Sequence, residues 1–406
     1  MTQPVVIIGA GQAALQAAES LRADGFAGAI TVVGDEPHLP YHRPPLSKDF
    51  LTGAASEQQL HMRTPEALAR KDITFLTGRR AVWIDRKARK VALEGGETLP
   101  YGGLLLATGS RPRLPPIPGV NLDGVLTLRT LDDARRLAAG LERAQPVAII
   151  GGGFVGLEIA AAARKAGKTV TVFEAAPRLM SRTSSPVIAQ FYADLHASHG
   201  ATIHLNAKIT EIAGKDGRPA GVITADGTHH AADLIVVGVG ARANDELAVA
   251  AGLECDNGII VDACARTADP FITAAGDCTA RRMPDGSLVR LESVHNAIEQ
   301  GKSAAAALLG RERPFGATPR FWSDQYDVKM QMAGLSQGYG TAVTRGDIGA
   351  RKFSAFYFRE GRLIAVDSIN SGGDHVRARK MLDAGNSLTP EQAADAGFDL
   401  ASAIGK

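Results

Sequence analysis

Two short glycine-rich segments contain the residues whose types and spacing could do chemistry. The first is a G-x-G-x-x-A pattern formed by Gly9, Gly11 and Ala14, between an apolar run and a helix-like segment. In such a pattern the first glycine allows a tight turn, the second lets the backbone approach a pyrophosphate, and the third small residue lets helix and strand pack closely. The amides at the start of the helix then bind phosphate. The segment therefore predicts a dinucleotide site.

The second segment is the fuller G-x-G-x-x-G pattern, which runs from Gly151 to Gly156. An acid ends the following strand in both copies, Asp35 in the first and Glu174 in the second. A carboxylate at this place accepts hydrogen bonds from the ribose hydroxyls and repels a 2′-phosphate, so Glu174 favours NADH over NADPH. Arg178 lies four residues on and could weaken this preference by attracting a 2′-phosphate, but we expect it to be a solvated surface residue.

Two such segments in one chain imply two bound dinucleotides. Two nicotinamides have no obvious chemistry between them, whereas a flavin accepts a hydride from a nicotinamide. We therefore predict FAD at the first segment and a nicotinamide cofactor, NAD, at the second.

The surrounding elements explain how these segments are positioned. Residues 4–35 and 146–174 both have the order strand, glycine turn, helix, strand, which is an internal duplication. Their strands are apolar throughout, as is typical of parallel strands covered by helices on both faces. Asp216-Gly217 and Asp226-Gly227 predict hairpin turns. After residue 316 the sequence predicts antiparallel strands and two helices, the second with Thr389 as its N-cap.

These elements predict an α/β protein with two Rossmann-like dinucleotide-binding domains and a small α+β C-terminal domain. The Pro-rich segment 111–119 indicates a linker out of the first domain. The expected bounds are an FAD-binding domain of residues 1–112 and 241–315, an NADH-binding domain of residues 113–240, and a C-terminal domain of residues 316–406.

Composition excludes several classes of function. The 406 residues carry 45 basic and 43 acidic side chains, a net charge of +2, so we expect no nucleic-acid partner, although a local basic patch stays open. The 3 cysteines form no CxxC pair, which favours a reducing, cytoplasmic location. No apolar run approaches the roughly 18 residues of a membrane span, so we expect no membrane association. No metal site is expected.

The motifs resemble those of a known family. GAGQAA (9–14), LLLATG (104–109), GGGFVGLE (151–158) and FITAAGDC (271–278) are similar to motifs of the glutathione-reductase-like pyridine-nucleotide flavoproteins. Within that group the chain resembles the FAD-dependent NADH:ferredoxin reductases. The segments that carry this second resemblance are PYHRPPLSKDFL (40–51), LRTLDDA (128–134), RLESVHNAIEQ (290–300) and FWSDQY (321–326).

The resemblance implies roles for individual residues. Lys48 is expected near the flavin N5 and paired with Glu158, and Trp322 beside the flavin on the side of the iron–sulfur partner. A core aromatic at a domain junction is the alternative for Trp322. With the glycine motifs included, the expected cofactor-binding residues are Gly9, Gly11, Ala13, Ala14, Asp35, Glu36, Arg43, Pro45, Lys48, Ala81, Ala107, Thr108, Gly109, Arg129, Gly151, Gly153, Phe154, Val155, Gly156, Glu174, Gly238, Gly240, Gly276, Asp277, Glu292, Ser293 and Val294.

The implied function is electron transfer from NADH through FAD, in single steps, to a 2Fe–2S ferredoxin that feeds a cytochrome P-450 monooxygenase or a Rieske dioxygenase. The ferredoxin is expected to be acidic and to meet a basic face that includes Arg63 and Lys302. We expect a monomer or a weak dimer.

Alternative functions on the same fold are an NADH oxidase or peroxidase, a disulfide reductase, or an apoptosis-inducing-factor-like flavoprotein. A thiol mechanism lacks a nucleophile in the expected place, because the first cysteine is Cys255 and Cys278 belongs to the GDC turn.

Overall fold

The computed structural model describes residues 3–405, and these form two compact units. The first comprises the described part of Met1–His42 together with Glu57–Arg111 and Ala241–Ala317. The second comprises Arg43–Ser56, Pro112–Gly240 and the described part of Thr318–Lys406. The segment Arg43–Ser56 thus belongs to the second unit, although the expected bounds placed it in the FAD-binding domain. Those domain bounds stay a prediction.

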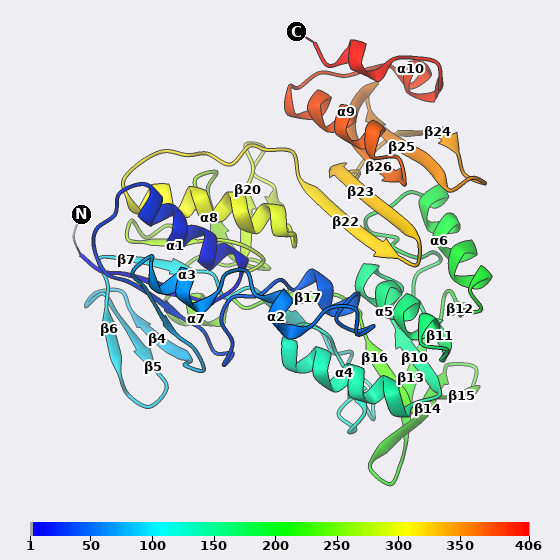
Figure 1. The fold of residues 1–406 in the computed structure, drawn as a ribbon, viewed down its shortest axis with the longest axis horizontal. Helices are drawn as coiled ribbons and strands as arrows, with labels where there is room; N and C mark the ends of the chain where they lie inside the picture. Colours follow the sequence, from blue (N-terminus) through cyan, green and yellow to red (C-terminus); the bar gives the residue numbers. More distant parts are fainter. Residues whose placement is uncertain (1–2, 406) are drawn as a thin grey trace. The chain divides into compact units, whose positions relative to one another are not determined.

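The centre of the first unit is a parallel five-stranded sheet in the order β19-β7-β1-β2-β3. Two helices, α1 (Gln12–Ala23) and α8 (Val294–Leu308), pack side by side on it, as Figure 1 shows. Its strands are β1 (Val5–Ile8), β2 (Ile30–Val33), β3 (Ile73–Leu76), β7 (Gly103–Leu106) and β19 (Ile272–Ala274).

The strand β1 shows why these segments are apolar throughout. Val5 and Ile7 face the core that α1 and α8 share with the sheet. Val6 and Ile8 face a second core on the other side. Successive side chains of a strand point to opposite faces, so a strand covered on both faces has no polar position. This confirms the predicted buried parallel strands.

Smaller elements complete the first unit. An antiparallel sheet has the order β4-β5-β6, and another sheet has the order β18-β20-β21. These elements are β4 (Ala81–Asp85), β5 (Lys90–Leu93), β6 (Thr98–Pro100), β17 (Ala241–Ala243), β18 (Ile259–Val261), β20 (Thr279–Arg282), β21 (Leu288–Val289), α2 (Glu57–Leu60), α3 (Pro65–Ala69) and α7 (Glu246–Ala250), and β8 (Ser110–Pro112) leads out of the unit.

The second unit repeats the plan with a parallel sheet in the order β12-β11-β10-β16-β9. Its elements are β9 (Val125–Leu126), α4 (Leu131–Arg143), β10 (Pro146–Ile150), α5 (Phe154–Lys165), β11 (Thr169–Phe173), α6 (Pro186–Ser198), β12 (Thr202–His204) and β16 (Leu234–Val237). The 3-10 turn η1 (Pro44–Ser47) also belongs to this unit. The predicted duplication and the predicted fold class are confirmed.

The predicted hairpins are present beside this sheet. Strands β13 (Ile209–Lys215), β14 (Arg218–Thr224) and β15 (His229–Ala231) form an antiparallel sheet. Asp216 and Gly217 connect the first two strands with φ angles of +52° and +78°. Positive φ at both central residues matches the twist of the flanking strands, which explains why an Asp-Gly pair occurs here.

The C-terminal part of the second unit is an antiparallel sheet in the order β22-β23-β26-β25-β24. Thr389 caps the last α-helix in a capping box with Gln392, which confirms the predicted N-cap. The strands β22 and β24 were not predicted from the sequence. The elements are β22 (Arg320–Gln325), β23 (Val328–Gly334), β24 (Thr341–Asp347), β25 (Lys352–Arg359), β26 (Arg362–Ile369), α9 (Gly372–Asp383), α10 (Pro390–Ala394) and η2 (Leu400–Ala403).

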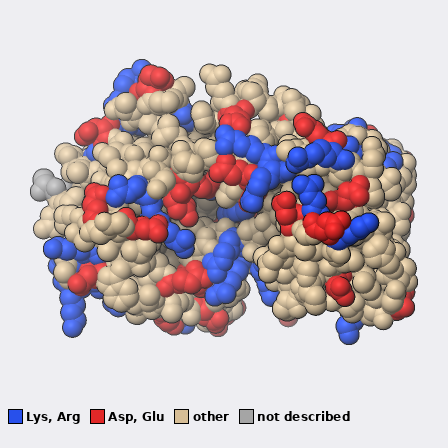
Figure 2. All heavy atoms as spheres, turned by 90° about the horizontal axis from the view of Figure 1, so that it is seen from below, with Lys and Arg blue, Asp and Glu red and all other residues tan. Residues whose placement is uncertain are grey.

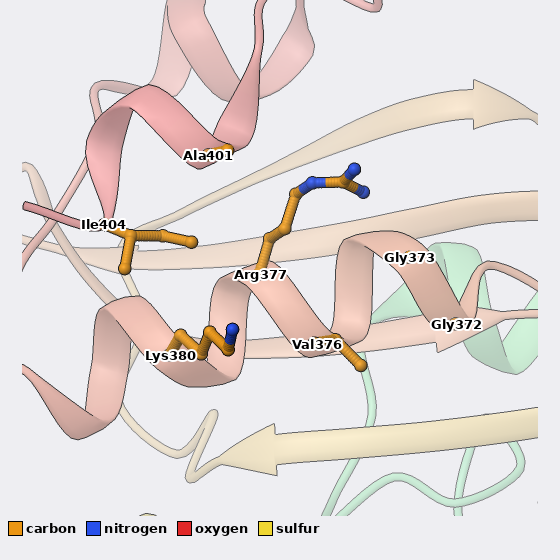
Figure 3. A pocket seen from close by; sticks show the side chains of 7 residues that line it. All are labelled: Gly372, Gly373, Val376, Arg377, Lys380, Ala401 and Ile404. Atoms are coloured by element: carbon orange, nitrogen blue, oxygen red, sulfur yellow. The ribbon is translucent and has the colours of Figure 1, made fainter.

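A hollow of about 520 Å³ lies between α9 and η2. Arg377, Lys380, Val376 and Ile404 line it, as Figure 3 shows. None of the residues expected to bind a cofactor lines this hollow. Within residues 3–405, no helix is both long enough and apolar enough to cross a membrane.

Candidate dinucleotide sites and the Lys48–Glu158 pair

The glycine turn of the first unit has the shape that a pyrophosphate requires. Gly9 has a φ of +104°, and a Cβ at this position would lie 2.1 Å from the carbonyl oxygen of Ala107, so no other residue fits. At Gly11 a Cβ would meet no atom within 4 Å, which leaves the backbone open to a ligand. Gly11 caps α1 without a side-chain hydrogen bond, so the first helical amides stay available. These residues fit the phosphates of a dinucleotide.

The other expected residues of this unit lie at the ends of strands and helices. Asp35 and Glu36 follow β2, and Asp35 is exposed. Thr108 and Gly109 follow β7, where the Thr108 hydroxyl donates to the carbonyl oxygen of Asn244 at 2.6 Å. Ligands in open parallel sheets bind beyond the carboxyl ends of the strands. The positions after β2 and β7 satisfy that rule.

The turn around Gly276 and Asp277 is held by α8, a feature that was not predicted from the sequence. The side-chain oxygen of Gln300 accepts from the Gly276 amide at 2.7 Å and from the Thr279 hydroxyl at 2.9 Å. Asn296 also donates to this oxygen, at 3.2 Å. Both helix residues belong to the motif RLESVHNAIEQ (290–300). Only the resemblance of that motif to the family could have indicated their importance, because no local pattern of residue types does so.

Three expected residues, Glu292, Ser293 and Val294, surround the start of α8. Ser293 is its N-cap and accepts from the Asn296 amide, and Val294 is its first residue. Arg290 pairs with Glu292 at 2.5 Å and donates to the carbonyl oxygens of Asp277 and Ala241 at 3.4 and 3.1 Å. Arg290 therefore connects the Asp277 turn to the start of the helix, a role that was not predicted from the sequence.

The glycine turn of the second unit is closely packed at its first and third glycines. Gly151 has a φ of +113°, and its Cβ would lie 2.4 Å from the carbonyl oxygen of Gly238. At Gly156 a Cβ would lie 2.3 Å from the Gly151 oxygen, whereas at Gly153 it would meet nothing within 4 Å. Only the middle glycine faces open space, which is where a phosphate would approach. This turn also fits a dinucleotide.

Glu174 stands at the end of β11 and is held in place by backbone amides. One carboxylate oxygen accepts from the Gly152 amide and the other from the Ala176 amide, both at 2.7 Å. The expectation for Arg178 is wrong, because this side chain is half-buried and donates to the carbonyl oxygens of Ser181 and Ser184. It closes the following loop and is not a solvated residue.

The structure confirms the predicted pairing of Lys48 with Glu158. The Lys48 ammonium lies 2.8 Å from the Glu158 carboxylate, with 14% and 4% of the two side chains exposed. The same carboxylate oxygen accepts from the Ser47 hydroxyl, and the other accepts from the Ser323 hydroxyl at 2.6 Å. A buried ion pair of this kind costs about 3–5 kcal/mol when one partner is removed, because the other charge is left uncompensated.

Lys48 is also held by the segment to which it belongs. Lys48 follows η1 and donates to the carbonyl oxygen of Pro44 at 3.2 Å, so it is not a solvated surface lysine. At the other end of η1, Arg43 donates to the carbonyl oxygen of Arg129 at 2.8 Å. The segment that contains η1 is thus joined to the start of α4 and to α5 within one unit.

Trp322 lies on β22 with 37% of its surface exposed. Its neighbour Phe321 packs on Phe154, with ring centroids 4.8 Å apart. Trp322 is therefore not a core aromatic. Its contact with a flavin stays a prediction.

The two residues expected in a basic face are both ion-paired. Arg63 and Lys71 share the carboxylate of Glu19, at 2.9 and 2.7 Å. Lys302 pairs with Glu299 at 2.6 Å, and Arg313 lies 3.8 Å from the same residue. Two cations share one carboxylate in each group, so each group keeps a net charge of +1.

The three cysteines are free thiols in the first unit. Burial raises the pKa of Cys255 to about 11, and burial also raises the pKa of Cys278, which is inaccessible to solvent. A thiolate is the reactive form, so both shifts disfavour thiol chemistry. Among residues 3–405 no group of His, Cys, Asp and Glu side chains could hold a metal ion.

Comparison with known proteins agrees with this geometry. Residues 3–301 match the family described as pyridine nucleotide-disulphide oxidoreductases, and residues 320–404 match the reductase C-terminal family. Rhodocoxin reductase from Rhodococcus erythropolis is 47% identical over 403 residues, which cover 99% of this chain and 94% of that protein.

Two solved structures of ferredoxin reductases are also similar to this chain. A ferredoxin reductase from Rhodopseudomonas palustris superimposes with a TM-score of 0.96 at 44% identity, covering 99% of this chain and 100% of that one. The reductase in a covalent putidaredoxin reductase–putidaredoxin complex gives a TM-score of 0.96 at 37% identity, with coverages of 100% and 99%.

The chain belongs to the pyridine nucleotide-disulphide oxidoreductases, the class of enzymes that its fold and its two glycine turns define. Within that class it is a member of the ferredoxin reductases that carry the reductase C-terminal domain. The predicted cofactors, FAD and NAD(H), are those of this family.

Proposed function

We propose that this chain is an NADH-dependent ferredoxin reductase that passes electrons singly to a 2Fe–2S ferredoxin of a cytochrome P-450 or Rieske oxygenase system. The observation that carries this proposal is the pair of nucleotide-shaped glycine turns in one chain, one per unit. Two of the three cysteines are buried, and burial raises the pKa of the third, Cys255, to about 11. The relatives named above as rhodocoxin and putidaredoxin reductases support the choice of acceptor.

The residues of the chain have separate parts in this function. The first glycine turn binds FAD, and the second binds NADH, with Glu174 selecting the unphosphorylated ribose. FAD held at the first turn would supply a two-electron acceptor that can release electrons one at a time, which would link a two-electron donor to a one-electron acceptor. Lys48 supplies a positive charge near the flavin N5, and Glu158 holds that charge in position. Trp322 covers the cofactor on the side of the ferredoxin.

The boundaries and location of the protein form part of the proposal. FAD is bound by residues 1–112 and 241–315, NADH by residues 113–240, and residues 316–406 form the C-terminal domain. We propose a cytoplasmic protein, because its three cysteines are unpaired and a reducing compartment keeps them so. It acts as a monomer or a weak dimer.

A direct experiment tests the proposal. NADH added without oxygen should bleach the flavin absorbance, and reduction of cytochrome c by NADH should require added 2Fe–2S ferredoxin. Rapid NADH-dependent reduction of oxygen or of a disulfide, in place of ferredoxin, would overturn it.

We propose that an acidic ferredoxin docks on two small clusters of charged side chains. One contains Arg63, Lys71 and Glu19, and the other contains Lys302, Arg313 and Glu299. Acidic and basic side chains lie next to one another on the face in Figure 2, so steering must come from small local excesses of charge. The Arg63 and Lys302 groups each keep one unit of positive charge. Glu19, the partner of Arg63 and Lys71, lies on α1, and Lys302 lies on α8. These two helices pack side by side in the first unit.

Charge variants test this docking face. Arg63→Glu or Lys302→Glu should slow ferredoxin reduction and weaken its salt dependence, while flavin reduction by NADH stays unchanged. Glu19→Gln is the matched control, because it frees Arg63 and Lys71 and should act in the opposite direction at low salt. Equal loss of both electron-transfer steps would place the docking face elsewhere.

A further inference from the structure

A line of buried hydrogen bonds extends from Glu158 away from Lys48. Ser323 donates to Glu158 and accepts from the side-chain amide of Gln325 at 3.1 Å. The Gln325 oxygen lies 2.8 Å from Nε2 of His196, and Nδ1 of His196 lies 3.2 Å from the Tyr326 hydroxyl. We call Ser323, Gln325, His196 and Tyr326 the Glu158 network.

Three of the four members of the network are buried within the second unit. Ser323 and His196 are fully buried, and Gln325 is 1% exposed. Each of these groups therefore depends on its protein partners for hydrogen bonding, because water cannot reach it. Buried polar groups that are fully paired fix one another's orientation.

The hydrogen bonds of the network run in one direction. Since the Gln325 amide donates to Ser323, its oxygen must accept from Nε2–H of His196. Burial lowers the pKa of His196 to about 4, so the ring is neutral near pH 7 and Nδ1 carries no proton. Tyr326 must then donate to Nδ1. Every donor points toward the Glu158 carboxylate, and aligned bonds of this kind strengthen one another.

At the far end of the network, Tyr326 lies in a strained turn, where it contacts His196, His199 and Lys165. Tyr326 has a φ of +57°, which an aromatic residue rarely adopts. Its ring stacks on His199 with centroids 3.7 Å apart, and its carbonyl oxygen accepts from Lys165 at 3.1 Å. Strain of this kind persists only where surrounding contacts impose it, and it often accompanies a functional site.

We propose that the Glu158 network is a set of positioning residues that holds the Glu158 carboxylate, and through it the Lys48 ammonium, in the orientation needed for hydride transfer. This inference rests on the proposed function, which places Lys48 at the flavin. The network touches neither cofactor in the proposal and acts only through Glu158. It assigns a role to the motif FWSDQY beyond Trp322.

A graded series of variants tests the proposal on the flavin-loaded protein. Flavin reduction by NADH should slow about tenfold in Ser323→Ala, about threefold in Gln325→Met and less than twofold in Tyr326→Phe. Ser323→Ala removes a hydrogen bond made directly to the charged Glu158 carboxylate, so its effect should be the largest. Gln325 and Tyr326 act on that carboxylate through one and three intervening hydrogen bonds, so their effects should be smaller. The affinity for NADH should not change, because Gly153 and Glu174 are untouched.

The midpoint potential of the bound flavin provides a readout besides activity. If Lys48 is less well held in Ser323→Ala, the potential should become more negative, by about 30 mV for a tenfold change in a two-electron couple. The matched control is Tyr357→Phe, which removes a buried hydroxyl bonded to Asp367 and Ser185 in the same unit and does not touch Glu158. The control should lose stability without a change in potential.

The tautomer of His196 gives a test that needs neither activity nor ferredoxin. Nitrogen NMR of the histidine-labelled protein at pH 7 should show His196 protonated at Nε2 alone, with the signal assigned by its absence in His196→Gln. In Gln325→Met this signal should shift. An Nδ1–H tautomer, an imidazolium, or a series no different from Tyr357→Phe would overturn the inference. Failure of the wild type to reduce ferredoxin would instead refute the proposed function, since none of these readouts uses ferredoxin.

Discussion

The two glycine turns follow the same sequence pattern but differ in how tightly the chain is packed around them. In the first unit the third position of the pattern is Ala14, whose side chain is fully buried. In the second unit it is Gly156, where a Cβ would lie 2.3 Å from the Gly151 oxygen. The first helix therefore stands far enough from its turn to accept a methyl group, and the second does not.

The acids that end the next strand differ as well. Asp35 is exposed, whereas both oxygens of Glu174 accept from backbone amides. A carboxylate fixed in advance loses little freedom when a ribose binds. The comparison indicates a more rigid second site, suited to a ligand that must bind and leave in every turnover.

The largest expected effects come from the first glycine of each turn. Gly9→Ala should yield protein without flavin, because its Cβ would meet the Ala107 oxygen at 2.1 Å and its φ is +104°. Gly151→Ala should keep the flavin spectrum but lose reduction by NADH. Absorbance spectra and anaerobic titration with NADH separate the two results, and loss of both cofactors in Gly151→Ala would contradict independent sites.

Substitution of the third residue should have a large effect in the second turn and a small effect in the first. Gly156→Ala should raise KM for NADH more than about tenfold, because the clash moves the helix start that binds phosphate. Ala14→Gly should cost only about 1 kcal/mol of stability through lower helix propensity. Steady-state kinetics and thermal unfolding measure these effects. Effects of similar size in the two variants would contradict the conclusion that the second turn is more tightly packed at its third position.

Replacement of Glu174 should narrow the preference for NADH. Glu174→Ser removes the acceptor for the ribose and the repulsion of a 2′-phosphate. It also leaves the amides of Gly152 and Ala176 without their partner, at about 1–3 kcal/mol for each one left unsatisfied. The ratio of kcat/KM for NADH and NADPH gives the result, with thermal stability measured alongside. A wild-type ratio near one would contradict the assignment.

The smallest effect is expected from the thiols, which occur only in the first unit. Substitution of Cys255, Cys264 and Cys278 together should leave NADH-dependent reduction of ferricyanide within about twofold. Some stability should be lost, because buried cysteines are packed as small apolar groups. Complete inactivity in a folded, flavin-loaded triple variant would restore a thiol mechanism.

Local patterns in the sequence were sufficient for the parts of the molecule that depend on neighbouring residues. The glycine turns, the Asp216-Gly217 hairpin and the Thr389 cap each follow from backbone conformations that only a few residue types adopt. The pairing of Lys48 with Glu158 came only from family resemblance, since the two residues lie on separate segments. No periodicity or spacing could have predicted it.

The tertiary structure alone decided the surroundings of these residues. Gln300 under the Gly276 turn, Arg178 on its loop, and the ion pairs of Arg63 and Lys302 all depend on partners that packing selects. The Glu158 network joins α5, α6 and β22, which the chain brings together only when the second unit is folded. Sequence determined which residues could bind dinucleotides, because that chemistry is written in short motifs. The partners of a buried charge come from distant segments that packing brings together, and a single sequence does not show which segments will meet.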